Sequence, residues 1–355
     1  MPPEVSILIV TWNSRDRVLA CLKTIHGLPD TVSREIVVVD NASADHTVEA
    51  IRAAWPDVHV VASPTNLGFG AANNLGYRLA SGRNILILNP DTRLLPGALG
   101  EMVAALRDPA IGCVGAKHYN TDMTLQWSMD DHPTVLSETI HYTDVHRLGL
   151  LRPWLHRRYP RWSAHNTERD VAWVNGACMM ITRTVMDTVR GFDEYFFLFA
   201  EELDLCRRIW NAGWRVRFLP QAGVIHDLGG SFDPGDGRRL VLLHQGSFRY
   251  ARRHFSPAQR GALHVFLRAN ALVRFATLLG VTAAEWVLRR PLMSELFLRL
   301  LVQHEDALPR SEAIRMWWAV ATVRTNADIQ PRTPRRVGPV GGDAAVRPHP
   351  HSGPT

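Results

Sequence analysis

Continuous apolar runs alternate with helical stripes along the first 90 residues of the chain. Apolar runs that end in polar residues predict four strands: Val5–Asn13 and Glu35–Ser43, which we expect to be buried on both faces, a short third strand over Val58–Ser63, and a fourth over Asn84–Asn89. Apolar residues at helical spacing predict three helices between them: Arg15–His26, Asp45–Trp55 and Gly70–Ala80. We expect Ser43 or Asp45 to cap the second helix. Strands that alternate with helices predict an α/β fold with a mostly parallel sheet.

The rest of the chain divides into three regions. Between about residues 120 and 170 the pattern weakens to a loop-rich insertion with some helix. A strand is then predicted over Val171–Arg183, with Gly176 and Ala177 in its middle, followed by a helix that begins with acidic residues and ends at Gly213. An alternating strand covers Trp214–Leu219. We therefore predict one domain over residues 1–238, a helical, basic, amphipathic region over 239–324, and a disordered Pro/Gly/Arg-rich tail over 325–355.

Composition describes an ordinary globular protein, with 46% hydrophobic and 21% charged residues. The four cysteines form no CxxC pair, which favours neither a disulfide framework nor a zinc site and indicates a reducing, cytoplasmic compartment. An apolar run begins almost at once, so we expect no signal peptide. No stretch approaches the ~20 uninterrupted apolar residues of a membrane span, so we expect none. The net charge of +6 suits an anionic membrane surface or nucleic acid.

Polar residues gather where the predicted strands end, and there ligands bind to parallel sheets. These residues are Thr11, Asn13, Asp40, Asn41, Asn89 and Asp91. A lone carboxylate after a strand is most often a turn residue. Here three acidic groups converge on one predicted edge: Asp40, Asp91, and the Glu201, Glu202 and Asp204 cluster at a helix start. Three such groups at one edge are harder to explain as turns, and a metal site at the edge of a strand is the other interpretation of Asp91.

Seven motifs occur in order over residues 5–232, about two thirds of the chain: SILIVTWNS, VVVDNASAD, NLGFGAANNLG, LNPDTRL, VNGACMMITR, GFDEYFFLFAEELDLCRR and VIHDLGGS. Together they resemble the inverting glycosyltransferases of family 2, and most closely the bacterial rhamnosyltransferase-like branch. The resemblance implies a GT-A fold, which is Rossmann-like with a mostly parallel central sheet flanked by helices, here carrying a helical C-terminal extension. A nucleotide-diphosphate sugar would lie across the edge of the sheet.

The resemblance also assigns nucleotide-binding residues. Asp40 matches the carboxylate that accepts a hydrogen bond from the pyrimidine ring N3–H, with Asn41 beside it. Thr11 and Asn13 match contacts from the first loop to the nucleoside. Three residues match a motif that closes over the nucleotide: Asn66, Gly68 and Asn73. That motif is no dinucleotide fingerprint, because it lacks the third glycine and follows the third strand, which argues against an oxidoreductase.

The NPD sequence resembles the metal-binding DxD motif of the family, with Asn89 in place of the first Asp and Asp91 retained. His226 matches a histidine that joins the metal in many relatives. The implied cofactor is a divalent cation, Mg²⁺ or Mn²⁺, of which Mn²⁺ suits imidazole better. A structural role for a lone histidine after a strand is the open alternative.

The EELD sequence matches the segment that supplies the catalytic base, which falls on Glu202, one methylene longer than the family's Asp. We expect Glu201 and Asp204 to orient the base or to bind acceptor hydroxyls. Caps placed for the helix dipole are the alternative for these acids. Acceptor-side residues are implied at Trp173, Asn175, Gly176 and Asp193, and the segment Leu125–Ser128 is expected near the sugar.

The implied function is a metal-dependent inverting glycosyltransferase that moves a sugar, with dTDP-rhamnose a candidate donor and a UDP-linked sugar another, to a glycan or polyprenyl-linked acceptor in cell-envelope polysaccharide synthesis. The C-terminal arginines fit peripheral binding at the inner face of the plasma membrane, or solvated positions on helices packed against the domain. A nucleotidyltransferase and a degenerate membrane-associated GT-A scaffold are the alternatives. The former needs glycines that the sequence TWNSRDR lacks. We expect no nucleic-acid partner.

Overall fold

The computed structural model describes residues 1–29, 32–143, 154–155, 165–227, 238–288 and 310–322. Residues 1–325 form one compact unit, and residues 326–355 are assigned to a second. The predicted disordered tail lies outside the described residues, as do residues 144–153 and 156–164 of the 120–170 insertion. The three predicted domain boundaries stay predictions.

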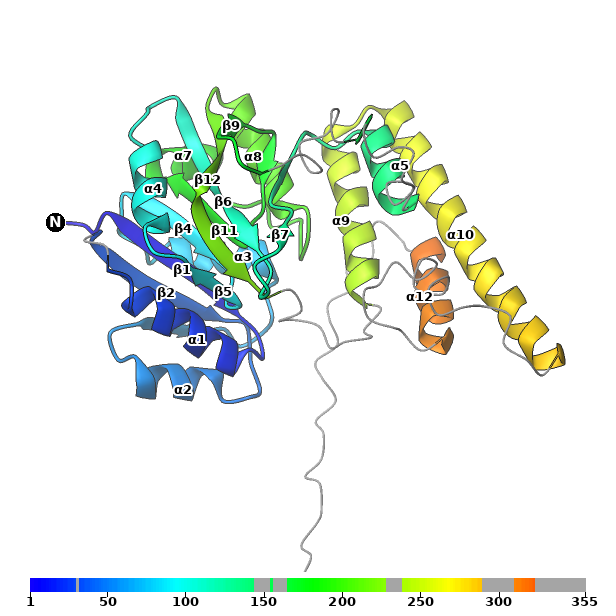
Figure 1. The fold of residues 1–355 in the computed structure, drawn as a ribbon, viewed down its shortest axis with the longest axis horizontal. Coiled ribbons are helices and arrows are strands. Elements are labelled where there is room, and N and C mark those ends of the chain that lie inside the picture. The colour runs from blue at the N-terminus through cyan, green and yellow to red at the C-terminus, as the bar shows by residue number, and fades with distance from the viewer. Residues whose placement is uncertain (30–31, 144–153, 156–164, 228–237, 289–309, 323–355) are drawn as a thin grey trace, which may run out of the picture. The chain divides into compact units, whose positions relative to one another are not determined.

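The central sheet is mixed and mostly parallel (Figure 1), which confirms the predicted fold class. Its strands, in spatial order, are β3 (His59–Ala62), β2 (Arg34–Asp40), β1 (Val5–Thr11), β4 (Asn84–Leu88), β11 (Cys178–Thr182), β6 (Ile111–Tyr119), β12 (Arg215–His226) and β5 (Thr92–Leu94). Strand β11 runs antiparallel between β4 and β6, and β12 is parallel to β6. The carboxyl ends of β1, β2, β4, β6 and β12 therefore point the same way.

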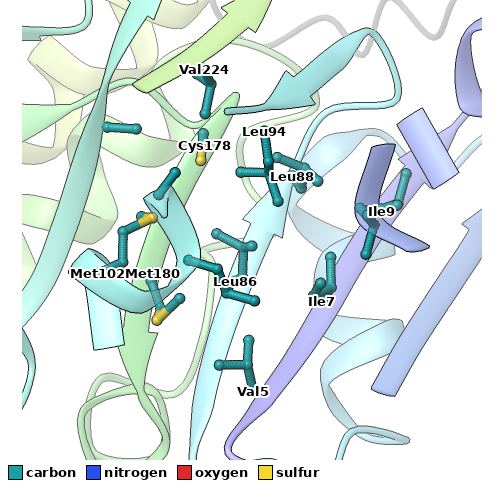
Figure 2. Close-up of a cluster of buried hydrophobic side chains, with 14 of the residues drawn as sticks. Val5, Ile7, Ile9, Leu86, Leu88, Leu94, Met102, Cys178, Met180 and Val224 are labelled. Atoms are coloured by element: carbon teal, nitrogen blue, oxygen red, sulfur yellow. The ribbon is translucent and has the colours of Figure 1, made fainter. Parts of the chain in front are cut away.

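Helices cover both faces of the sheet, because its strands are apolar on both sides. Helices α1 (Arg15–His26), α2 (Thr47–Ala54) and α4 (Ala98–Ala105) bury side chains in one core, and α3 (Phe69–Tyr77), α7 (Arg183–Val189) and α8 (Glu201–Asn211) pack in the other. Figure 2 shows the first core, into which Ile7 and Ile9 of β1, Leu86 of β4 and Met180 of β11 all point. Leu8 belongs to the opposite core, as the period of two along a strand requires.

Three local predictions were wrong. The stretch from Val171 to Arg183 forms two strands, because the Asn175 Oδ1 accepts a hydrogen bond from the Ala177 N–H at 2.8 Å and turns the chain between them. The first, β10 (Trp173–Val174), pairs with β8 (Met129–Asp130) in a separate two-stranded sheet. Strand β12 continues past Leu219 to His226, with an irregularity between Leu219 and Gly223.

The third correction concerns the start of α2. The N-cap residue is His46, in the left-handed region at φ 62°, and not Ser43 or Asp45. The side chain of Asp45 still accepts a hydrogen bond from the Thr47 N–H at 3.2 Å, so it holds the first turn without occupying the cap position. The prediction that Gly213 ends α8 is confirmed, because Gly213 follows the last turn at φ 95°.

The C-terminal extension is helical, as predicted. Helices α9 (Arg238–His254), α10 (Pro257–Leu288) and α12 (Arg310–Thr322) pack together, and α5 (Val135–Thr143) from the insertion joins them. Three short strands complete the described elements, β7 (Leu125–Gln126) and β9 (Arg169–Asp170) on the central sheet and β8 on the small one. We expected no membrane span, yet α10 alone among the described helices is long and apolar enough to cross a membrane by length and composition.

Candidate active site

The candidate site lies at the carboxyl ends of three neighbouring strands. Thr11 ends β1 and pairs in register with Asp40, which ends β2. Strand β4 ends at Leu88, and the following Asn89 donates its backbone N–H to the Ala177 carbonyl at 2.9 Å. The parallel sheet thus brings together residues almost 80 positions apart in sequence.

Asp40 presents one carboxylate oxygen without a partner. Its Oδ2 accepts the Ser43 N–H at 2.9 Å, whereas no group in the described part of the chain hydrogen-bonds to the buried Oδ1. Burial raises the pKa of Asp40, against the hydrogen bonds from Ser43 that lower it. The hydroxyl of Thr11 is likewise buried without a described partner. Buried polar atoms normally have partners, so these two atoms are suited to meet a ligand.

Two other predicted nucleotide residues hold loops in place. Asn13, at φ 48°, accepts the Ala44 N–H on its Oδ1 at 2.7 Å. The Asn41 side chain accepts the Leu67 N–H at 3.2 Å and donates to the Gly68 carbonyl at 3.1 Å. Both amides therefore tie the strand ends to the loops that border the site.

The NLGFG loop makes a close approach to the loop before α8. Asn66 Oδ1 accepts the Gly68 N–H at 2.9 Å, and the Phe69 N–H donates to the Phe197 carbonyl at 2.8 Å. Gly68 has φ 82°, and a Cβ added there would lie 2.3 Å from the Phe197 carbonyl oxygen. Only glycine fits such a position. Asn73 donates to the Phe69 carbonyl at 3.0 Å, and its buried Oδ1 has no partner among the described residues.

Asp91 and His226 meet at the predicted metal position. The His226 Nε2 lies 3.4 Å from the Asp91 Oδ1 and 3.5 Å from the Asn89 Nδ2. Both side chains are nearly buried, at 7% and 8% exposed, and no described group hydrogen-bonds to the Asp91 Oδ1. The contact arises because β5 and β12 pair, with Thr92 opposite His226.

Gln126 fixes the tautomer of His226. The Gln126 Nε2 donates to the His226 carbonyl at 3.1 Å and to the Asn120 Oδ1 at 2.9 Å, which assigns the other amide atom as oxygen. That Oε1 lies 2.7 Å from the His226 Nδ1, so Nδ1 carries the proton. In the neutral ring, Nε2 then presents its lone pair toward Asp91. This is the state in which a histidine binds a metal.

Glu201 and Glu202 form a pair of carboxyl groups at the start of α8. Glu201 is 4% exposed, and burial together with the neighbouring Glu202 raises the pKa of Glu201 well above its usual value. Burial raises the pKa of Glu202 to about 7, opposed by hydrogen bonds from the backbone N–H groups of Glu202 and Ala200. Glu202 keeps some exposed surface and Glu201 almost none. As the pH rises, Glu202 therefore ionises first, near neutral pH, while Glu201 keeps its proton.

Glu202 is joined to the metal position through one short segment. A Cβ built on Gly176 would lie 3.4 Å from the Glu202 Cβ, so the segment around Gly176 contacts the start of α8. The next residue, Ala177, accepts the Asn89 N–H at its carbonyl. Asn175 makes the turn that precedes it, and the Trp173 Nε1 donates to the Asp131 carbonyl at 3.0 Å. The acceptor-side roles of these residues stay predictions.

Two of the predicted acids are paired with side chains of α9, and their expected roles at the site stay predictions. Burial would raise the pKa of Asp204, but His254 at 2.8 Å and Arg208 at 2.7 Å together hold it below its usual value. The Asp193 Oδ2 accepts from Arg253 at 2.6 Å. Since His254 and Arg253 both belong to α9, these acids anchor α9 against α8 and the loop before it.

Two residues that sequence reasoning missed organise the site. Gln126 sits within the Leu125–Ser128 segment that was expected near the sugar, but nothing in its residue type pointed to His226, 100 positions away. Asn74 donates to the Phe192 carbonyl and accepts the Phe192 N–H, both at 2.9 Å. The adjacent Asn73 and Asn74 in a helix were the available signal, because asparagine is uncommon in helix interiors unless its amide has a partner.

Comparison with known proteins adds relatives of known activity. The N-acetylglucosaminyl-diphospho-decaprenol L-rhamnosyltransferase of Mycobacterium tuberculosis is 27% identical over 287 residues, which cover 77% of this chain and 91% of the relative. A hexosyltransferase of low-salt glycan biosynthesis from Haloferax volcanii is 23% identical over 83% of this chain and 87% of its own length.

The fold is also found among solved structures. A mannosyltransferase from Pyrobaculum calidifontis, solved with GDP-Man and Mn²⁺, superposes with a TM-score of 0.53 at 20% identity, covering 93% of this chain and 89% of that one. At this identity the likeness shows the GT-A fold alone. The model of glycosyl transferase family 2 matches residues 6–188, just over half of the chain. With the ordered motifs and the fold, this match establishes that the chain belongs to glycosyltransferase family 2.

Proposed function

We propose that this glycosyltransferase moves a hexose, with inversion at the anomeric carbon, from a pyrimidine nucleotide-diphosphate donor to a polyprenyl-linked acceptor in envelope polysaccharide synthesis. One observation carries the proposal: three chemically distinct groups lie at one edge of the sheet and beside the Gly176–Ala177 segment. These are the open carboxylate oxygen of Asp40, the Asp91–His226 pair, and the Glu201–Glu202 pair. The name of the Mycobacterium tuberculosis relative supports a decaprenol-linked acceptor and rhamnose as the sugar.

Asp40 supports a pyrimidine base in the donor. A carboxylate oxygen accepts hydrogen bonds only, and uracil and thymine carry an N3–H donor that cytosine lacks. The unpartnered Oδ1 is such an acceptor, and the Ser43 N–H on the other oxygen holds the carboxylate in place. We therefore propose dTDP-rhamnose as the donor, with a UDP-linked sugar as the alternative.

The residues at the metal position fit a divalent cation. Asp91 supplies a carboxylate oxygen without a described partner, and His226 supplies an imidazole nitrogen with its lone pair exposed to the site. The described residues contain no group of three His, Cys, Asp or Glu that could hold a metal. Asp91 and His226 would hold the ion together with oxygens of the donor diphosphate. A bound Mg²⁺ or Mn²⁺ supplies positive charge that stabilises the leaving diphosphate.

Glu202 is proposed as the base that removes the proton from the acceptor hydroxyl as that oxygen attacks the anomeric carbon. A pKa of about 7 leaves a substantial fraction of Glu202 ionised at neutral pH while keeping it basic enough to take a proton. Glu201 remains protonated beside it and adds no second negative charge. Attack from the side opposite the leaving diphosphate inverts the configuration at the anomeric carbon.

Thermal unfolding with nucleotides tests this proposal. We expect UDP or dTDP with Mn²⁺ or Mg²⁺ to raise the Tm, since a ligand at ~100 times its Kd adds about 2.7 kcal/mol to stability. GDP and ADP serve as base controls, and Asp91→Ala should remove the dependence on metal. No stabilisation by any nucleotide would contradict the proposal and favour a degenerate scaffold. Stabilisation by GDP or ADP alone would contradict a pyrimidine base in the donor.

A further inference from the structure

Helix α10 presents a long apolar face that no described residue covers. Arg268 is the only charged residue among its exposed side chains, although the helix has 32 residues. The large apolar side chains on this face are Val265, Leu272, Val273, Leu279, Trp286, Val287 and Leu288. Trp286 is 82% exposed, and Trp318 of α12 is 52% exposed. An exposed apolar face of this length indicates an interaction surface.

The opposite face of α10 packs against neighbouring helices of the protein. Leu263 and Leu267 pack with Phe248 of α9, whereas Ala271 and Leu278 pack with Trp317 of α12. In the middle of the helix, the buried Arg274 donates to the Tyr142 carbonyl at 3.3 Å and lies over the Trp317 ring at 5.1 Å. A helix with one packed face and a buried central arginine is built to lie on a membrane, and not to cross it as an isolated span.

Charge identifies the partner. Between Arg238 and Arg290 the sequence has ten arginines and one acidic residue, Glu285. Two copies of this arginine-rich region brought together would repel each other, whereas an anionic lipid surface would attract each of them. Exposed positions of α10 such as Val273 and Gly280 also lack the charges that specify helix pairing in coiled coils. Tryptophans near one end suit the headgroup level of a bilayer.

We propose that the exposed face of α10 docks the enzyme onto an anionic membrane, with Leu272, Leu279 and Trp286 inserted among the lipids. This deepens the proposed function, because a polyprenyl-linked acceptor lies in the membrane, but the docking does not require catalysis. The docked helices are tied to the active-site helix, because α9 holds Asp204 through His254. Docking thereby fixes α8 and its acids relative to the lipid surface.

Vesicle co-sedimentation of the full chain tests the docking surface. Wild type should bind vesicles of phosphatidylcholine with about one third phosphatidylglycerol better than pure phosphatidylcholine, and salt should weaken that binding. Leu272→Glu/Leu279→Glu should lower the partition coefficient by about tenfold or more. Leu79→Glu/Met123→Glu is the matched control, since it adds the same charge at exposed apolar positions elsewhere and should bind as wild type does.

The outcomes are distinguishable. Equal vesicle binding by wild type and Leu272→Glu/Leu279→Glu would overturn the proposal. So would a dimer seen by sedimentation velocity without lipid and dissociated by that substitution, because the face would then bind a second copy. Nucleotide-dependent Tm shifts, measured on the same proteins without lipid, report the donor site separately. Intact shifts with lost vesicle binding would support docking through α10.

Discussion

The pH dependence of transfer gives a quantitative test of the carboxyl pair. If Glu202 is the base, its pKa of about 7 in the substrate-free enzyme controls the acidic limb of kcat/KM. At pH 6 such a group is ionised in about one molecule in ten, and at pH 5 in about one in a hundred. The rate should therefore fall roughly tenfold per pH unit below neutrality. A glutamate with the ordinary value of 4.5 would leave the rate almost constant down to pH 6.

The assay is initial-rate transfer from the nucleotide sugar identified by thermal unfolding, measured from pH 5 to 8.5 in buffers of constant ionic strength. Glu202→Gln should abolish turnover while leaving the nucleotide-dependent Tm shift intact. Glu201→Gln should keep an inflection near 7, because a protonated Glu201 adds no charge beside Glu202. A flat profile between pH 5 and 7, or an active Glu202→Gln enzyme, would refute the assignment of the base.

The same pair makes a prediction that needs no substrate. Burial raises the folded-state pKa of Glu201 above its unfolded value, so the folded state binds the proton more tightly. That stabilising contribution is complete below about pH 4.5 and is lost as pH rises toward the folded-state pKa. Glu201→Gln cannot ionise, so its free energy of unfolding should exceed that of wild type more at pH 8 than at pH 5. Urea unfolding at both values measures the difference, and an unchanged difference would show that Glu201 ionises normally.

Three further substitutions test separate contacts. Asp40→Ala should weaken UDP and dTDP binding by about 1.5–3 kcal/mol, the range for hydrogen bonds to charged groups, and calorimetry measures it. Gly68→Ala should lower stability to urea by at least about 2 kcal/mol, because a Cβ would meet a carbonyl oxygen at 2.3 Å. Gly97→Ala is its control, since that residue also has positive φ but nothing within 4 Å. Gln126→Leu should weaken metal-dependent nucleotide binding by about 10- to 100-fold and change the ¹⁵N shifts of His226. Unchanged shifts would contradict the tautomer assignment.

The parts of the fold that follow local rules could be predicted from sequence. Strands β1, β2 and β4 are buried on both faces, so each appears as an unbroken apolar run, and the polar residue after each run falls at the sheet edge. The stop at Gly213 follows from a single residue that tolerates positive φ. A parallel sheet is then enough to place Asp40 and Asp91 at the same edge. Local pattern and topology agree over this half of the chain, and prediction succeeded there.

Elsewhere the fold depends on pairing between segments far apart in sequence, which the same reasoning could not predict. Strand β11 is antiparallel and lies between β4 and β6, a position that no local pattern specifies. The break at Asn175 depends on a side-chain hydrogen bond to the backbone two residues later. Helix α8 begins after Phe199 and Ala200, both at positive φ, where sequence rules expect glycine or asparagine. The ion pairs of Asp204 and Asp193 with α9 depend on the packing of the C-terminal helices, which periodicity does not fix.

The Asn at position 89 has a consequence for how the metal binds. An Asp there would place a second carboxylate beside the Asp91–His226 pair, whereas the Asn89 Nδ2 lies 3.5 Å from the His226 Nε2 and adds no charge. With Asp91 as the one anionic ligand, the protein should bind Mn²⁺ weakly until the diphosphate supplies more oxygens. Mn²⁺ alone should therefore leave the Tm of wild type unchanged, whereas Asn89→Asp should gain stabilisation by Mn²⁺ without nucleotide. If Mn²⁺ alone stabilises wild type as much as Mn²⁺ with UDP or dTDP does, the protein holds the metal by itself and the charge argument fails.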